Sequence, residues 1–157
     1  RPGDTLYRDV PVEFPPIPSF SPEYFSVVRG KDPSKHKQFR KGIEQLDQEG
    51  VVQVLRSDKR GEQAPVFAAV GPMQFEVATH RMAAEIGAAI SLESLPYQVA
   101  RIVDPEDADF VNRQVSAEVL TRTDGVMLVL FSTPWRLEGF QRDNPSITLR
   151  SLVAAEG

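Results

Sequence analysis

Two kinds of hydrophobic pattern alternate along residues 24–95, and their order predicts an α+β fold. Short stretches rich in β-branched and aromatic residues are typical of strands. They occupy residues 24–29, 51–56, 66–70 and 89–95. Two longer stretches between them repeat apolar residues every three or four positions, which is the spacing of one buried helix face. The order βαββαβ predicts a ferredoxin-like split plait, with four antiparallel strands that carry both helices on one face.

The two helices have clear start and stop signals. Asp32 is a candidate N-cap, Pro33 follows at the first helical position, and Gly50 is a candidate left-handed C-cap. The apolar stripe of this first helix consists of Phe39, Ile43 and Leu46. We expect the second helix to begin at Pro72 and end at Gly87, with a stripe of Phe75, Ala78, Met82 and Ile86.

Residues 96–157 predict a second unit, of order β-α-β-α-β. Its first strand would span residues 97–103, and Asp104-Pro105 then repeats the start signal of Asp32-Pro33. Val111, Val115 and Val119 would line the helix that follows. The next three elements are expected at residues 126–131, 133–140 and 147–152, with the turn Asp124-Gly125 before them. A unit of this size alone would bury only about 60% of its surface, so we expect it to pack on the plait of residues 23–95.

Residues 1–22 are different in character, because they hold six of the 13 prolines. Proline fixes φ and lacks an N–H donor, so this segment predicts an extended linker, with room for a short strand over Thr5–Val12. The chain begins Arg1-Pro2-Gly3-Asp4, without an initiator Met or an apolar leader. We therefore expect it to be an internal piece of a longer protein.

The composition of the chain excludes several kinds of functional site. The 157 residues are 41% hydrophobic and 25% charged, which is ordinary for a globular domain. No apolar run approaches the roughly 18 residues that a transmembrane helix needs. Cysteine is absent, which excludes disulfides, thiolate metal sites and cysteine nucleophiles and fits a reducing, cytoplasmic location.

No catalytic constellation is found either. Gly30-Lys31 resembles the end of a phosphate loop, but the loop needs a glycine five residues earlier and Ser or Thr next, where Phe25 and Asp32 stand. The two histidines, His36 and His80, are 44 positions apart and have no metal-ligand spacing. We therefore expect no catalytic residue, metal site or cofactor in this chain.

Positive charge is concentrated around the first helix. Six cationic residues fall within thirteen positions and are opposed only by Asp32: Arg29, Lys31, Lys35, Lys37, Arg40 and Lys41. Lys37 and Lys41 share one helix face at a spacing of four. The stripe is either a solvated helix face or a surface that binds the phosphates of RNA. Arg56, Lys59 and Arg60 form a second candidate group. Because the formal net charge is -4, any nucleic-acid contact has to be local.

Trp135-Arg136 is a further feature that stands out. A lone tryptophan near the start of a helix is usually a core anchor, which is the interpretation we favour, and the alternative is an interface hot spot.

The strand-to-helix junction Gly71–Val77 (Gly-Pro-Met-Gln-Phe-Glu-Val) is the most distinctive motif. We interpret Gly71 as the residue of a tight turn, Phe75 as a core residue, and Gln74 and Glu76 as exposed. With this motif, the chain resembles the C-terminal region (domain III) of the bacterial peptide chain release factor 3 family, translational GTPases related to elongation factor G. Gln74-Phe75 favours the release-factor branch. Further segments that carry the resemblance are residues 3–6, 17–25, 32–38, 42–46 and 49–54.

The resemblance implies a role in translation termination. Members of the family, bound to GTP, promote departure of class I release factors from the ribosome. The resemblance implies that GTP or GDP with magnesium binds in an N-terminal domain outside this chain, and that residues 1–22 lead from a β-barrel domain. The expected partners are the ribosome, those two domains and the class I release factor, and neither a membrane nor DNA. The motif does not fix which residues meet the ribosome.

Two other kinds of function remain open on the residues alone. A plait can be a regulatory module that binds a small molecule such as an amino acid, in the manner of ACT domains. It can also be a free-standing RNA-binding module, which places aromatic residues on exposed central strands. Residues 51–56 and 66–70 contain Phe67 as their sole aromatic, which weighs against the RNA-binding version.

Overall fold

A computed structural model describes residues 21–57, 59–61, 63–114 and 117–152 of the chain. The predicted linker of residues 1–22 falls almost entirely outside this part, and so does the short strand predicted over Thr5–Val12. The boundaries 1–22, 23–95 and 96–157 therefore stay predictions.

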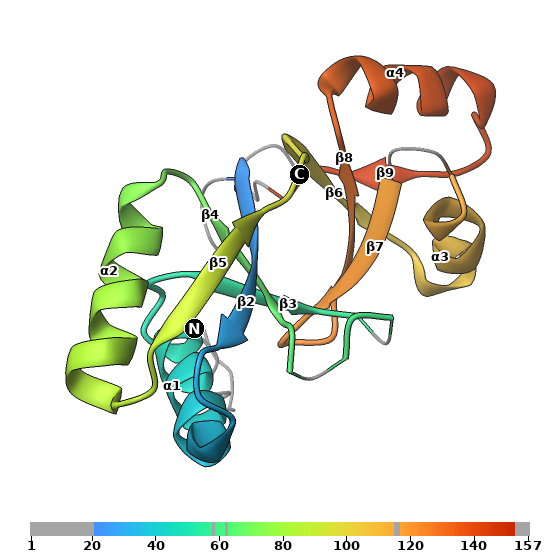
Figure 1. Ribbon diagram of the computed structural model, residues 1–157. Coiled ribbons are helices and arrows are strands. Elements are labelled where there is room, and N and C mark those ends of the chain that lie inside the picture. The colour runs from blue at the N-terminus through green and yellow to red at the C-terminus, as the bar shows by residue number, and fades with distance from the viewer. Residues whose placement is uncertain (1–20, 58, 62, 115–116, 153–157) are drawn as a thin grey trace, which may run out of the picture.

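The first half of the fold is the predicted ferredoxin-like plait. Its elements are β2 (Tyr24–Gly30), α1 (His36–Gln48), β3 (Gln53–Arg56), β4 (Val66–Ala69), α2 (Met73–Arg81) and β5 (Ile90–Ser94). The strands lie in the order β5-β2-β4-β3 and every neighbouring pair is antiparallel. Both helices cover one face of these strands (Figure 1).

The ends of α1 follow from local sequence. The Asp32 carboxylate accepts a hydrogen bond from the Ser34 amide at 3.0 Å, and a 3-10 turn, η1 (Pro33–Lys35), leads into the helix. At the other end, Gly50 has φ +78°. The amide of Val51 then donates to the carbonyl of Leu46 at 3.1 Å, which completes a Schellman motif. The sequence suggested that β3 begins at Val51. It begins at Gln53, because Val51 takes part in this closing bond of the helix.

α2 continues without a break into a π-helical turn, η2 (Met82–Ile86), which Gly87 ends with φ +81°. Ala78 and Met82 of the predicted stripe are fully buried, and Phe75 and Ile86 are partly buried against the same core. The predicted apolar face of this helix is thus confirmed.

The second half repeats the topology of the first. Its elements are β6 (Val99–Val103), α3 (Pro105–Asn112), β7 (Ala117–Arg122), β8 (Met127–Phe131), α4 (Pro134–Asp143) and β9 (Leu149–Arg150). The strand order β7-β8-β6-β9 is the reverse of the order in the first half. In each half, the second strand lies at the centre of the whole sheet and the fourth strand lies at its edge. β8 is buried on both faces, since Leu128 to Phe131 are all buried.

The predicted order β-α-β-α-β was wrong, because a further strand, β7, lies between α3 and β8. α3 ends at Asn112, and Val119 lies in strand β7, so the predicted helix does not reach it. A spacing of four fits a helix, but it also fits one face of a strand, and the pairing of Val119 with Val129 of β8 selects the strand. Asp104 does not cap α3 with its side chain; its carboxylate instead accepts a hydrogen bond from Arg150 at 2.8 Å.

The two halves share one eight-stranded sheet, joined where Leu55 and Arg56 of β3 pair with Arg122 and Thr121 of β7. The helix-free faces of both halves contribute to a common core. Phe25, Val27 and Leu55 come from one half, and Leu120 and Leu128 from the other. α1 and α2 lie on one flank of the molecule and α3 and α4 on the opposite flank (Figure 1). The sheet therefore bends so that its bare face is buried between the halves.

Candidate nucleic-acid interface

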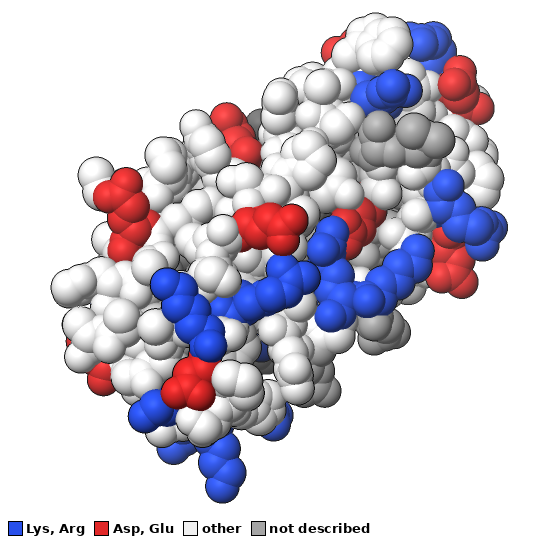
Figure 2. All heavy atoms as spheres, viewed as in Figure 1, with Lys and Arg blue, Asp and Glu red and all other residues white. Residues whose placement is uncertain are grey.

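The described lysines all belong to one region, because every lysine of the chain lies between residues 31 and 59. Lys37 and Lys41 are exposed on the outer face of α1, one turn apart. Lys31 is exposed and Lys35 half-buried in the turn that leads into the helix. Figure 2 shows lysine and arginine side chains in a band across the middle of one face, and further ones at the lower end of the view, where Figure 1 places α1. The predicted stripe is thus a surface feature, with α1 as its rigid support.

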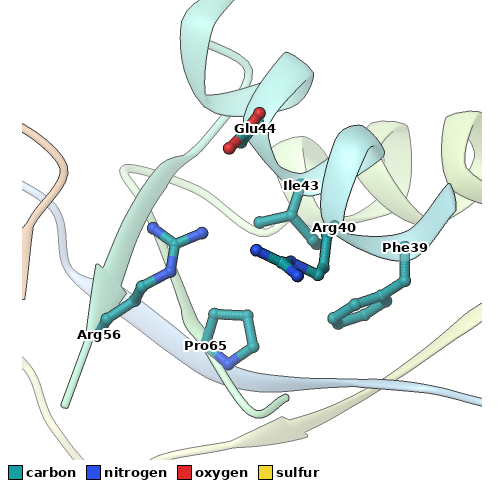
Figure 3. Close-up of a pocket in the computed structure, with 6 residues that line it drawn as sticks. All are labelled: Phe39, Arg40, Ile43, Glu44, Arg56 and Pro65. Carbon is teal, nitrogen blue, oxygen red and sulfur yellow. The ribbon is translucent and has the colours of Figure 1, made fainter. Parts of the chain in front are cut away.

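Two predicted arginines from different elements line one cavity. Arg40 projects from α1 and Arg56 ends β3, and the cavity between them measures about 150 Å³. Figure 3 shows the two guanidinium groups turned toward each other, with Glu44 above them and Phe39 and Pro65 at the base. Two guanidinium groups aimed into one space can bind a phosphate oxygen from both sides.

A second hollow, of about 360 Å³, lies beside the first and shares Phe39 with it. Arg29 and Arg60 line it together with Asp32 and His36. The Arg29 side chain, which is 55% exposed, donates to the Glu93 carboxylate at 3.0 Å. The structure therefore brings the two predicted cationic groups side by side around the N-terminal half of α1.

Besides lining the second hollow, Arg60 forms an ion pair at the junction of the two halves. Its Nε and Nη2 donate to the two carboxylate oxygens of Glu118 on β7, at 2.7 and 2.8 Å, and the Tyr97 hydroxyl donates to the same carboxylate at 2.9 Å. Burial raises the pKa of Glu118, but the hydrogen bonds from Arg60 and Tyr97 outweigh this and leave its pKa below the usual value. Burial, followed by the bond to Glu118, raises the pKa of Tyr97 to about 12. Arg60 is thus a predicted binding residue whose donors are already engaged across the junction.

Sequence reasoning missed a further link at this junction. The Asp47 carboxylate at the end of α1 accepts hydrogen bonds from the Thr123 hydroxyl, in the β7–β8 turn, and from the Val54 amide at 3.3 Å. Burial raises the pKa of Asp47 despite these bonds. No sequence signal could reveal the link, because Asp47 and Thr123 are 76 positions apart.

Gln74 of the Gly71–Val77 motif proves to be a structural residue. Its Oε1 accepts hydrogen bonds from the amides of Val70 and Gly71, at 3.0 and 3.1 Å, and its Nε2 donates to the Val51 carbonyl at 3.2 Å. The expectation that Gln74 is exposed was wrong, because it ties the end of β4 to the segment before β3. Glu76 is exposed, as expected, and Phe75 packs against the core of the first half. Gly71 has no positive φ and a Cβ there would meet nothing within 4 Å, so the turn does not require glycine.

The Gly30-Lys31 pair does not have the surroundings of a phosphate loop. A Cβ on Gly30 would lie 3.3 Å from the Phe39 ring, so the small residue here serves packing against α1. The Lys31 amide donates to the Ala89 carbonyl at 2.9 Å and is therefore engaged within the fold. Neither residue is therefore placed as in a phosphate loop.

The geometry also bears on the alternative functions. An RNA-recognition plait binds bases on the helix-free face of its sheet, but here Phe25, Val27 and Val66 on that face are buried in the common core. The two hollows described above are smaller than, or at the lower limit of, the roughly 300–1,000 Å³ of small-molecule sites.

Within residues 21–152, as far as they are described, no group of three or more acidic or histidine side chains is placed to hold a metal ion. The helices of that same part are all too short or too polar to cross a membrane.

Trp135 does not anchor the core. It is 68% exposed at the start of α4, and the Arg136 guanidinium lies 5.5 Å from its ring centre. The favoured interpretation of this tryptophan was therefore wrong.

Comparison with known proteins identifies the class to which this fold belongs. The family model described as "Class II release factor RF3, C-terminal domain" matches residues 14–141. Since the match takes in most of the chain, the chain belongs to this family, whose domain is a ferredoxin-like α+β fold.

Several curated relatives carry the name "Peptide chain release factor 3". The protein of Symbiobacterium thermophilum is 42% identical over 158 residues, which is 99% of this chain and 30% of the relative. Those of Synechococcus elongatus and Microcystis aeruginosa are 39% and 40% identical over 153 residues, or 96% of this chain and 28% of each relative. The chain thus spans less than a third of the length of these relatives and corresponds to the C-terminal module of a release factor 3. The comparisons give no support to the small-molecule or free-standing RNA-binding alternatives.

Proposed function

We propose that this module faces the ribosome and that α1 and its surroundings contact ribosomal RNA. In the longer protein, the module would take part in the GTP-dependent departure of class I release factors during translation termination. The observation that carries the proposal is the grouping of the cations around α1 on a chain of net charge -4. A local cationic surface on an acidic body is attracted to phosphate by counterion release, while the remainder of the surface repels it.

The site has a centre and a periphery. The Arg40–Arg56 cavity is the place where a phosphate would be held from two sides, and Lys37 and Lys41 extend the same surface along α1. Lys31, Lys35 and Lys59 would add contacts at the edges, and Arg29 would contribute after releasing Glu93. Arg60 would act indirectly, because its guanidinium holds Glu118.

The chemistry of GTP belongs to another part of the longer protein. GTP or GDP with Mg²⁺ would bind in a GTPase domain outside this chain, and the absence of phosphate-loop surroundings at Gly30-Lys31 supports this. The other proposed partners are a β-barrel domain of the same polypeptide and the class I release factor, and the proposed location is the cytoplasm.

Charge reversal on α1 tests the proposal. In the full-length protein, K37E together with K41E should weaken ribosome binding. The slope of log affinity against log salt should fall by about 2, because each lysine that no longer binds a phosphate lowers it by about 1. Arg113 and Arg142 are exposed on the second half, and R113E with R142E is the matched control, expected to leave binding unchanged. Unchanged affinity of the α1 variant at low salt would refute this surface assignment without touching the family assignment.

A further inference from the structure

The outer face of α2 has a composition opposite to that of α1. At the spacings four, three and four, α1 exposes Lys37, Lys41, Glu44 and Gln48. At the same spacings, α2 and η2 expose Met73, Val77, His80 and Ala84. A helix that meets only water normally carries charged residues on its outer face, as α1 does.

This face continues into other exposed apolar side chains at one end of the first half. Six large hydrophobic side chains of the described residues are exposed, and four of them gather here: Tyr24, Val70, Met73 and Val77. Tyr24 begins β2 opposite Ala69 of β4, and Val70 and Met73 follow Ala69 in the chain. Figure 1 shows the start of β2, the end of β4 and the start of α2 at the same end of this half. In Figure 2 the flank formed by α2 shows few charged side chains.

We propose that the surface of Tyr24, Val70, Met73 and Val77 is the docking surface for the part of the same polypeptide that precedes this domain. The matched family is a C-terminal domain, and the curated relatives are more than three times as long as this chain, so the remainder of such a protein lies before it. The chain enters strand β2 through Glu23, whose amide donates to the Ala69 carbonyl at 3.0 Å. The described part of the chain thus begins beside the apolar surface.

The chemistry of the surface favours a protein partner over RNA. The outer stripe of α2 contains no lysine or arginine, whereas RNA contacts depend on such cations. Met73 is 67% exposed, and an unbranched, adaptable thioether is a common residue of protein contact surfaces. Gln74 holds the start of α2 in place from the inner side, so the surface is presented rigidly.

The native methionines offer a test that needs no substitution. Met73 is exposed and Met82 is fully buried, so the rate of sulfoxide formation in dilute peroxide, followed by mass spectrometry, reports on each separately. In the 157-residue chain Met73 should oxidise fast and Met82 slowly. In the full-length protein Met73 should be protected by about tenfold or more, while Met82 stays slow.

A pair of variants sharpens the test. V77E places a charge in the proposed contact and should restore fast oxidation of Met73 in the full-length protein without altering the melting temperature of the isolated chain. Q38E, on the exposed face of α1, is the control and should change neither quantity.

Three outcomes would overturn the proposal. Met73 could oxidise equally fast in both proteins, or it could be protected in the full-length protein only after ribosomes are added. Protection of Met73 in the isolated chain that grows with concentration would identify a second copy as the occupant. The inference rests on the family assignment and not on ribosome binding, so a failure of the α1 surface leaves it intact.

Discussion

Gly42 lies where the first helix approaches the turn at the end of the second. A Cβ there would be 2.6 Å from Sδ of Met82 and 2.9 Å from Cδ1 of Ile86. Gly139, inside α4, has only the flexible Arg142 guanidinium nearby, at 3.6 Å. The two glycines are therefore in helices for different reasons, although the sequence does not distinguish them.

This difference predicts opposite effects of the same substitution. Alanine is worth up to about 1 kcal/mol over glycine inside a helix. At Gly42 the overpacking against fully buried Met82 costs roughly 1–3 kcal/mol, so G42A should lower the free energy of unfolding. G139A should raise it by about 0.5–1 kcal/mol. Urea unfolding of the two variants beside the wild type checks the signs, and a stabilising G42A would contradict the close packing.

At the scale of elements, three helices begin at a polar residue followed by proline, yet their caps differ. Asp32 and Thr133 accept a backbone hydrogen bond from the first turn, at 3.0 and 3.1 Å. Asp104 has the same place in its helix but turns to Arg150 on β9. The dipeptide predicts a helix start correctly in each case, and the tertiary neighbours decide whether the side chain caps it.

The capping role can be measured at Thr133. T133A should lower the free energy of unfolding by about 1 kcal/mol, and T133S should keep most of it, because serine provides the same hydroxyl acceptor. D104A removes an exposed ion pair and no cap, so its effect should be smaller. Equal losses in T133A and D104A would argue against the cap assignment.

At the scale of the whole molecule, a short ladder and a few polar links join the two halves around their common core. The β3–β7 ladder pairs two residues of each strand, and Arg60, Glu118 and Tyr97 lie across the same junction. The Glu118 side chain is only 14% exposed, whereas Glu93 in the Arg29–Glu93 pair is 70% exposed. The first pair is shielded from solvent, so it should contribute more to stability than the second.

Acid should therefore loosen the junction through Glu118. Its pKa is lower in the folded chain than the ordinary value of 4.5, so its contribution is complete above that value and is lost as pH falls through the folded pKa. E118Q should destabilise on the order of 1–3 kcal/mol at pH 7, and the difference from wild type should shrink as pH falls below the ordinary value of 4.5. E93Q is the control and should have little effect at either pH. Urea titrations at pH 7 and pH 3.5 make the comparison; a gap that stays constant with pH would refute the charged role of Glu118.

Much of the fold was predictable because its signals are local. The first plait follows from the stripe of Phe39, Ile43 and Leu46, the cap at Asp32 and the left-handed Gly50, all within one helix. Strand β7 was missed because valines four apart satisfy both a helix and a strand, and only pairing with β8 separates the two. Trp135 was placed in the core because composition cannot tell which face of a short helix is covered.

The candidate site, too, was predictable from the sequence only where its signals are local. The sequence located the cations of α1, since their density is a property of thirteen successive positions. It could not show that Arg40 and Arg56 share a cavity, or that Arg60 is held by a carboxylate 58 positions away. Nor could it show that Gln74, in the most distinctive motif, bonds to three backbone groups.

By itself, the sequence determined the class of fold, the first plait, the basic surface of α1 and the resemblance to its family, because periodicity, caps and motifs act over a few residues. The tertiary structure alone decided that the second half repeats the first, that their bare sheet faces are buried together, and that α2 keeps an apolar face outward. These features depend on pairings between residues far apart in the chain, and the energy of such contacts is absent from any local pattern.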